Sequence, residues 1–183
     1  MKYLVPVFLL ALAGPAFAQA ADPAAAANAF YAVYGAQHAQ TGGGIPDATG
    51  RLRYSAVVSP RLNKQLADAA AAQRRLTARM KNVVPPMLEG DIFSSLFEGA
   101  TGWKVGACPN DGKTARCTVA LTYAPPPGAG AKAAKPASWN DTVVLTSTPQ
   151  GWKVDDVLYD AGFAFGNTGR LSSMLQMVVA ANP

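Results

Sequence analysis

The chain has 183 residues, of which 50% are hydrophobic, and it carries a formal net charge of +5 at neutral pH. This length is enough for one domain that buries its own core. A nucleic-acid-binding protein would need a much denser basic stripe, so we expect no nucleic-acid partner. The sequence also contains no metal-ligand cluster, nucleophile elbow, phosphate loop or dinucleotide fingerprint. We therefore expect no metal, no cofactor and no catalytic residue that a motif would identify.

The first residues predict a secretory signal peptide over 1–18. Lys2 precedes the apolar run 3–12, and Ala16 and Ala18 provide the small side chains of a cleavage site. A membrane anchor is the alternative, but the apolar run is much shorter than the roughly 20 residues that cross a hydrocarbon core. We therefore expect cleavage after Ala18, a single mature domain over 19–183 without a transmembrane segment, and a periplasmic or secreted location.

The first predicted helix of the mature chain covers residues 23–39. Asp22 and Pro23 are typical of a helix start, and the glycines at 42–44 end the segment. A loop over residues 46–58 connects this helix to the next.

The second predicted helix begins at Ser59 and Pro60 and runs to about residue 81. Apolar residues recur every three or four positions, which predicts one buried stripe. Basic residues fall on nearly the opposite side, either as a solvated face, which is the simpler interpretation, or as a surface for phospholipid headgroups or an acidic partner. These cations are Arg61, Lys64, Arg75 and Arg79.

Residues 91–99 predict a short helix with Asp91 as its cap and Gly99 as its end. Its apolar side chains, among them Phe93 and Phe97, must be buried against another element. A role as a catalytic acid is the alternative for Asp91, but capping explains this residue without further assumptions.

The second half of the chain predicts strands and a closing helix. Residues 125–138, rich in Pro, Gly, Ala and Lys, have too few apolar side chains to pack and are expected to form a mobile loop. Helices followed by several antiparallel strands predict an α+β fold. The strands are expected over 101–108, 115–123, 139–147 and 151–159, and the closing helix is expected to be capped by Asn167 or Thr168.

The two cysteines predict a disulfide bond. Cys108 and Cys117 flank the strong turn signal at 109–112, and an exported chain keeps such a bond oxidised. When the cysteines pair, however, strand alternation places the apolar rows of the two strands on opposite sides of the sheet. A bulge near Pro109 would resolve this conflict, and so would burial of both faces.

Three runs together resemble the bacterial family called domain of unknown function 3828. They are EGDIFSSLF at 89–97, WND at 139–141 and GWKVDDVLY at 151–159, and the resemblance extends over about 27–175. It implies a fold similar to nuclear transport factor 2, in which N-terminal helices and a C-terminal helix pack on a curved antiparallel sheet of about four strands to form a cone. It also implies a cell-envelope setting. The family has no common activity from which to carry over catalytic residues.

Proteins related to this cone include isomerases and dehydratases that bury a polar residue in an apolar cavity. His38 has no partner that the sequence identifies. Asp155 and Asp156 are neighbours on a strand and point to opposite faces, so they are not a catalytic dyad. Asp141 is expected to be half-buried and bound by backbone amides or an arginine of the second helix. The polar candidates are Tyr34, His38, Asp141, Asp155, Asp156 and Tyr159.

We therefore expect an exported, non-enzymatic binding or interaction protein that holds a small apolar ligand or a cell-envelope partner. The alternatives are a small hydrolase, isomerase or dehydratase on the same fold, and an immunity or inhibitor protein against a secreted toxin. A homodimer is left open. A pocket is expected near Phe30, Tyr34, His38, Phe93, Trp103, Tyr123, Trp152 and Asp156.

Overall fold

Three helices precede the strands and a fourth follows them, in the order of helices, strands and closing helix that the sequence predicts. The structure, a computed structural model, describes residues 22–81, 88–128 and 135–181, so the expected signal peptide and part of the loop at 125–138 lie outside the described residues. The described part consists of four helices and a five-stranded antiparallel sheet. The α+β class is therefore confirmed.

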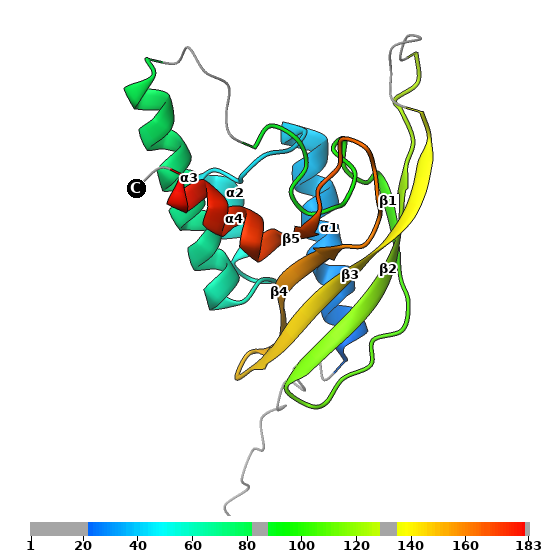
Figure 1. Ribbon diagram of the computed structural model, residues 1–183. Coiled ribbons are helices and arrows are strands. Elements are labelled where there is room, and N and C mark those ends of the chain that lie inside the picture. The colour runs from blue at the N-terminus through cyan, green and yellow to red at the C-terminus, as the bar shows by residue number, and fades with distance from the viewer. Residues whose placement is uncertain (1–21, 82–87, 129–134, 182–183) are drawn as a thin grey trace, which may run out of the picture.

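The sheet is a meander in which each strand pairs with the next one along the chain (Figure 1). Along β2 and β3 every second residue is buried, so one face of the sheet carries the core. The four predicted strands are present, the first one shorter than expected, and a fifth strand extends the edge. Their bounds are β1 (Gly102–Val105), β2 (Thr114–Tyr123), β3 (Ala137–Thr148), β4 (Gly151–Tyr159) and β5 (Gly169–Arg170).

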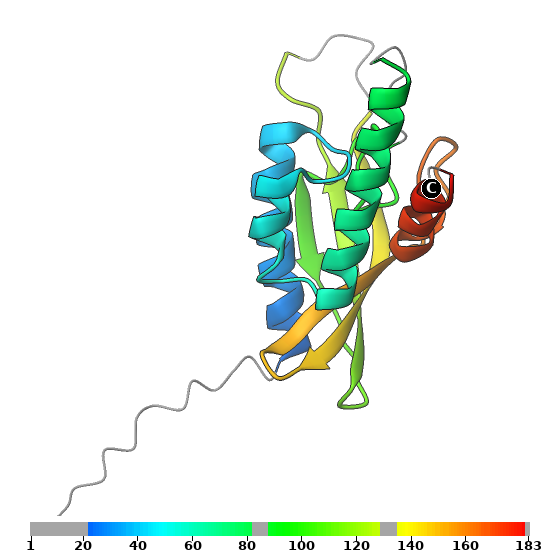
Figure 2. The same ribbon diagram turned by 90° about the vertical axis from the view of Figure 1, so that its left-hand side faces the viewer.

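The long helices cover the buried face of the sheet. Helix α1 (Pro23–Thr41) contacts β1 to β4, and α3 (Pro60–Arg79) lies on the same side (Figure 2). Helix α4 (Leu171–Ala180) packs on α3 and reaches β4 and β5. Within the described part of the chain, no helix combines the length and the apolar character needed to cross a bilayer.

The starts of α1 and α3 agree with the predicted caps. The Asp22 side chain accepts a backbone N–H from the first turn of α1 at 2.9 Å, and Ser59 accepts one from the first turn of α3 at 3.0 Å. Helix α1 extends to Thr41, past its predicted end, and α3 ends at Arg79 rather than at residue 81. The caps are therefore easier to predict than the ends.

The connection between these two helices contains a helix that the sequence did not predict. Helix α2 (Ala48–Tyr54) is capped by Asp47, whose side chain accepts the backbone N–H of Gly50 at 2.7 Å. A glycine in a short helix lowers its intrinsic propensity, and this hides the element in the sequence. Helix α2 contacts both α1 and α3 and brings Tyr54 into the core.

The helix predicted at 91–99 is absent, and residues 91–98 form a series of tight turns instead. Asp91 still accepts a backbone N–H two residues later at 2.7 Å, and Gly99 adopts a φ of 81°. The segment cannot continue as a helix because the backbone N–H of Ser95 donates to the carboxylate of Asp141 at 2.7 Å rather than to a carbonyl of its own turn.

Helix α4 starts later than predicted, and neither Asn167 nor Thr168 caps it. The residue at its N-cap position, Arg170, makes no side-chain capping bond. Asn167 instead donates to two carbonyls of the 91–98 turns at 2.6 and 2.7 Å. The cap of α4 comes from Asp156 on β4, which is described below.

The disulfide between Cys108 and Cys117 is formed, and a bulge resolves the register conflict. The backbone N–H of Gly106 donates to the carbonyl of Thr118 at 2.8 Å, while the N–H of Thr118 donates to the carbonyl of Ala107 at 3.0 Å. Two residues thus oppose one, which is the definition of a bulge. The extra residue brings the cysteines opposite each other and leaves the apolar rows of both strands on one face.

Candidate binding site

A cavity of about 180 Å³ lies at the C-terminal end of α1. Its walls come from α1, from the loop that follows it, from α2 and from the 91–98 turns, so four separate pieces of chain meet there. Its polar and aromatic lining residues are Tyr34, Gln37, His38, Thr41, Asp47, Tyr54, Asp91 and Phe93.

His38 stacks on Tyr34 and faces Asp91. The centroids of the Tyr34 and His38 rings are 5.4 Å apart, and Nδ1 of His38 lies 3.1 Å from Oδ2 of Asp91, within ion-pair distance although off the angle of a good hydrogen bond. The interaction with Asp91 raises the pKa of His38 above its ordinary value, while burial opposes the change. A side chain at Gly99 would overlap the imidazole, so the glycine makes this approach possible.

Asp91 is the negative centre of the cavity. The residue is only 3% exposed. Its Oδ1 accepts the backbone N–H of Phe93, which leaves Oδ2 to face His38. Burial, followed by the charge of Asp91, raises the pKa of both Tyr34 and Tyr54, so their hydroxyls stay protonated. The cavity therefore combines one buried carboxylate with neutral phenols.

Aromatic rings give the cavity a rigid base. The Tyr54 and Phe93 ring centroids are 4.9 Å apart, and those of Tyr34 and Phe93 are 6.2 Å apart. Phe30 packs behind them, 5.5 Å from Phe93 and 5.9 Å from Tyr54. The Tyr34 hydroxyl accepts the backbone N–H of Ala100 at 2.7 Å, which fixes this ring to the start of the sheet.

Few groups around the cavity could take part in acid–base or nucleophilic chemistry. The imidazole that lines it is that of His38, whose Nδ1 faces Asp91 at 3.1 Å. The hydroxyl of Thr41 donates to the carbonyl of Gln37 at 3.1 Å, and no serine or cysteine lines the cavity. Among the residues that the structure describes, no group of three or more His, Cys, Asp or Glu side chains could hold a metal ion.

Asp141 is a structural carboxylate whose two oxygens are both satisfied. It is fully buried. It accepts the backbone N–H and the hydroxyl of Ser95, the indole N–H of Trp139 at 3.0 Å and the backbone N–H of Asp160 at 3.1 Å. The backbone amides expected as partners are present, whereas the alternative partner, an arginine, is not among its bonds.

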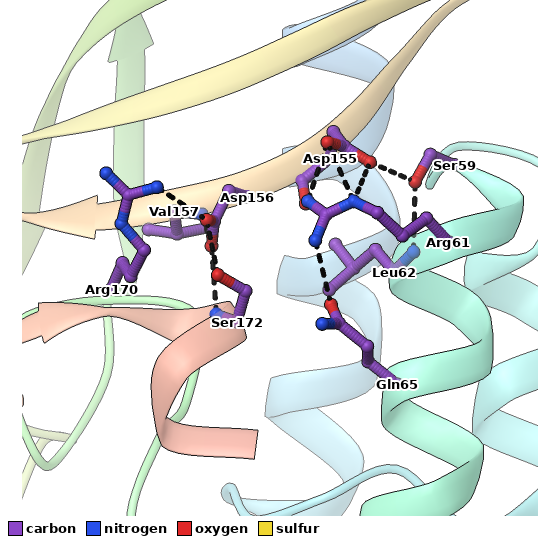
Figure 3. A network of polar contacts seen from close by, with 9 residues as sticks. All are labelled: Ser59, Arg61, Leu62, Gln65, Asp155, Asp156, Val157, Arg170 and Ser172. Atoms are coloured by element: carbon purple, nitrogen blue, oxygen red, sulfur yellow. Dashed lines mark hydrogen bonds and ion pairs between the residues drawn. The ribbon is translucent and has the colours of Figure 1, made fainter. Parts of the chain in front are cut away.

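Asp155 and Asp156 anchor two different helices (Figure 3). The pairing of β3 with β4 passes over Asp155 as a bulge. Its carboxylate binds the guanidinium of Arg61 at 2.6 to 3.0 Å and accepts the hydroxyl of Ser59, both at the start of α3. This bond neutralises part of the basic helix face predicted from the sequence. On the same face, Lys64 pairs with Asp68 at 2.6 Å.

Asp156 caps α4 from a neighbouring strand. It is 3% exposed and accepts the backbone N–H and the hydroxyl of Ser172 at 2.9 and 2.7 Å. Arg170 lies 3.6 Å from the same carboxylate. The two neighbouring carboxylates thus turn toward different helices, and neither lines the cavity.

The structure divides the residues predicted to surround one pocket. Tyr34, His38 and Phe93 line the cavity, with Phe30 directly behind them. The others belong elsewhere, which corrects the expectation of a single aromatic pocket. Trp103 stacks on Tyr31, Tyr123 ends β2, Trp152 lines a separate hollow beside the start of α1, and Asp156 caps α4. Tyr159, one of the polar candidates, donates its hydroxyl to the carbonyl of Ile92.

Sequence reasoning missed Gln37, Asp47 and Tyr54 as site residues, and for Asp91 it preferred capping over a role in a site. Gln37 lies one turn before Thr41 on the same helix and could have been found from the position of Tyr34 and His38. Asp47 and Tyr54 could not, because α2 itself was unpredicted. The second role of Asp91 depends on a contact with His38 that no local pattern indicates.

A second, more apolar hollow of about 370 Å³ lies on the outside of the 91–98 turns. Phe97 and Phe165, which are 48% and 92% exposed, are among its lining residues. Glu98 and Lys135 add one charge of each sign to its lining. It fits the apolar ligand expected from the sequence better than the cavity at the end of α1 does.

The chain was compared with protein-family models, curated proteins and solved structures, and no family model, no curated protein and no solved structure matches it.

Proposed function

We propose that this protein is an exported, non-enzymatic binding protein that holds a small molecule in the cavity at the end of α1. The observation that carries the proposal is the state of the polar groups around the cavity. The carboxylate of Asp91 is enclosed and faces Nδ1 of His38 at 3.1 Å, and neither a serine nor a cysteine is among the residues that line the cavity, so its polar groups suit recognition of a ligand better than nucleophilic chemistry.

The size of the cavity limits the ligand to a few heavy atoms. Its volume of about 180 Å³ is below the roughly 300 to 1,000 Å³ of pockets that hold drug-sized compounds. Phenol, amide and carboxylate groups make up much of its lining. A small molecule with a polar group therefore fits this cavity better than the purely apolar ligand expected from the sequence.

Export to the periplasm or the outside of the cell is the second part of the proposal. The predicted signal peptide at 1–18 and the disulfide between Cys108 and Cys117 support it, since reducing compartments seldom maintain such a bond. A cone similar to nuclear transport factor 2 is the corresponding proposal for the fold. N-terminal sequencing of the protein from a cell-envelope fraction tests export, and we expect the chain to begin at Gln19.

A cavity-blocking variant tests ligand binding. Thr41→Phe places a ring at the mouth of the cavity, on an exposed helix position. Ala39→Phe is the matched control, because it adds the same ring to the same turn at an exposed position that does not line the cavity. Native mass spectrometry of protein purified from the envelope should show a small bound molecule in the wild type and in Ala39→Phe, and none in Thr41→Phe. Equal occupancy in both variants would exclude the cavity as the site.

A cell-envelope partner is a second candidate function, favoured by the exposure of Phe165 at the apolar hollow. Phe165 is 92% exposed and Phe97, on the same hollow, is 48% exposed, so the two rings form an apolar patch of the kind that marks interaction sites. A photocrosslinking amino acid at position 165 tests this in living cells. Leu52, which is 74% exposed on α2, is the matched control position. We expect a discrete protein adduct from position 165 and none from position 52.

A further inference from the structure

The charge inside the cavity is set by Asp91. Its carboxylate is almost completely buried, and among the residues lining the cavity only His38 can oppose it with a positive charge. A second carboxylate, that of Asp47, also lines the cavity and accepts only the backbone N–H of Gly50 among the bonds seen. When His38 is neutral, the cavity is therefore negative.

The nearby arginines do not reverse this charge. Arg51 donates to the carbonyl of Pro46 at 3.1 Å. Arg53 donates to the side-chain oxygens of Gln37 and Gln40 at 3.0 and 2.8 Å. Neither guanidinium is among the groups that line the cavity. Both arginines therefore support the cavity wall from its outer side, while carboxylates and aromatic rings line the interior.

The aromatic rings add to the attraction for a positive charge. Tyr34, Tyr54 and Phe93 all line the cavity, and each ring carries negative potential on its face. A carboxylate beside aromatic rings suits the recognition of substituted ammonium groups, because cation–π attraction and ion pairing act on the same nitrogen. A neutral ligand of equal shape would gain neither the cation–π attraction nor the ion pair.

We infer that the cavity binds a small organic cation, with an ammonium nitrogen placed between the Asp91 carboxylate and the rings of Tyr34, Tyr54 and Phe93. This inference rests on the proposed function, since it names the chemical class of the ligand that the cavity holds. The alkyl groups on the nitrogen contact the rings, and the positive charge faces the carboxylate.

Binding of such a cation competes with the proton of His38. The groups around this imidazole are Asp91 from the turns and Tyr34 from α1, while Asp47 and Tyr54 line the same cavity. Protonated His38 already neutralises Asp91, so the organic cation binds more weakly in acid. As the pH rises and His38 loses its proton, Asp91 becomes available and the affinity increases.

Choline and its uncharged isostere dimethylbutanol are the probes for this inference, because they differ in charge and hardly in shape. Isothermal titration calorimetry over about pH 5 to 9 brackets the ordinary histidine pKa of about 6.5. We expect choline to bind at least about tenfold more tightly than dimethylbutanol at high pH, and we expect this preference to fall in acid. Equal affinities for the two probes would overturn the inference.

Substitutions test which side chains cause the preference for choline. Asp91→Asn keeps the acceptor for the backbone N–H of Phe93 but removes the charge, and should weaken choline binding by about tenfold or more. Asp68→Asn, on the exposed surface of α3, is the control for loss of a carboxylate and should bind like the wild type. His38→Gln should bind choline with little dependence on pH.

A pair of substitutions at Tyr54 covers the case in which Asp91→Asn fails to fold. Tyr54→Phe keeps the ring and should retain choline binding, whereas Tyr54→Leu removes it and should lose most of the affinity. Equal binding by these two variants would contradict a role for the ring.

The failure of this inference can be distinguished from the failure of the proposed function. If dimethylbutanol binds as well as choline and Thr41→Phe blocks both, the cavity is a binding site for neutral ligands. If the molecule that copurifies with the wild type stays bound in Thr41→Phe, the proposed function itself fails.

Discussion

Two regions of this protein bury carboxylates in different ways. Asp141 and Asp156, on the sheet, accept hydrogen bonds on both oxygens from backbone amides and hydroxyls that do not titrate. Asp91, at the end of α1, has one oxygen bound to an amide and the other facing the titratable ring of His38. The first arrangement is permanent, whereas the second depends on a proton.

This difference distinguishes carboxylates that only stabilise the fold from carboxylates that can still bind a ligand. Breaking the hydrogen bonds of a fully bonded, buried carboxylate costs much free energy, and such a carboxylate has no free oxygen lone pair with which to bind a ligand. A buried carboxylate opposed by a single histidine can exchange that partner for another cation. The contrast explains why the proposed site lies at Asp91 although the sheet contains more buried acidic side chains.

The largest expected effect follows from removing a fully bonded carboxylate. Asp141→Ala leaves the N–H of Ser95, the indole of Trp139 and the N–H of Asp160 without their acceptor. We expect a loss of about 3–5 kcal/mol in the free energy of unfolding, because each buried donor left without a partner costs about 1–3 kcal/mol. Urea denaturation measures it.

Asn140→Ala, at the exposed neighbouring position on β3, is the control for Asp141→Ala and should change the stability by less than about 0.5 kcal/mol. Similar stabilities for the two variants would show that the bonds of Asp141 do not hold the 91–98 turns.

A smaller effect is expected from the carboxylate that caps α4. Asp156→Ala removes the acceptor of the Ser172 N–H and hydroxyl, and we expect about 2 kcal/mol of destabilisation. Hydrogen exchange should locate the change in α4 rather than in α3. Asp155→Ala should show the opposite pattern, because Asp155 binds Ser59 and Arg61 at the start of α3.

The elements that the sequence predicted well are those whose signals are local. Asp22 and Ser59 lie directly before the helices that they cap, and alternation along β2 and β3 is visible within each strand. Helix α2 was missed because its signal is short and contains Gly50. A local pattern is sufficient for an element, but not for its exact length.

The parts that the sequence could not predict depend on contacts between distant residues. Ser95 and Asp141 are 46 positions apart, and their bond replaces a predicted helix with turns. Asp156 caps a helix 16 positions away, so neither Asn167 nor Thr168 is needed for that role. Aromatic character identified part of the cavity, but only the fold shows which rings meet.

The smallest of these expected effects is a dependence of stability on pH that originates at His38. Asp91 raises the pKa of this residue in the folded state, so the folded protein holds the proton more tightly than the unfolded chain does. The stabilisation is complete below the unfolded pKa of about 6.5 and is lost as the pH rises through the folded value. We expect a change of about 0.5–1 kcal/mol, the range of partly exposed ion pairs. Thermal or urea unfolding across this interval measures it, and His38→Gln should lack the change. An increase in wild-type stability with pH over the same interval would mean that burial outweighs Asp91, and His38 would then be neutral in the folded protein even in mild acid.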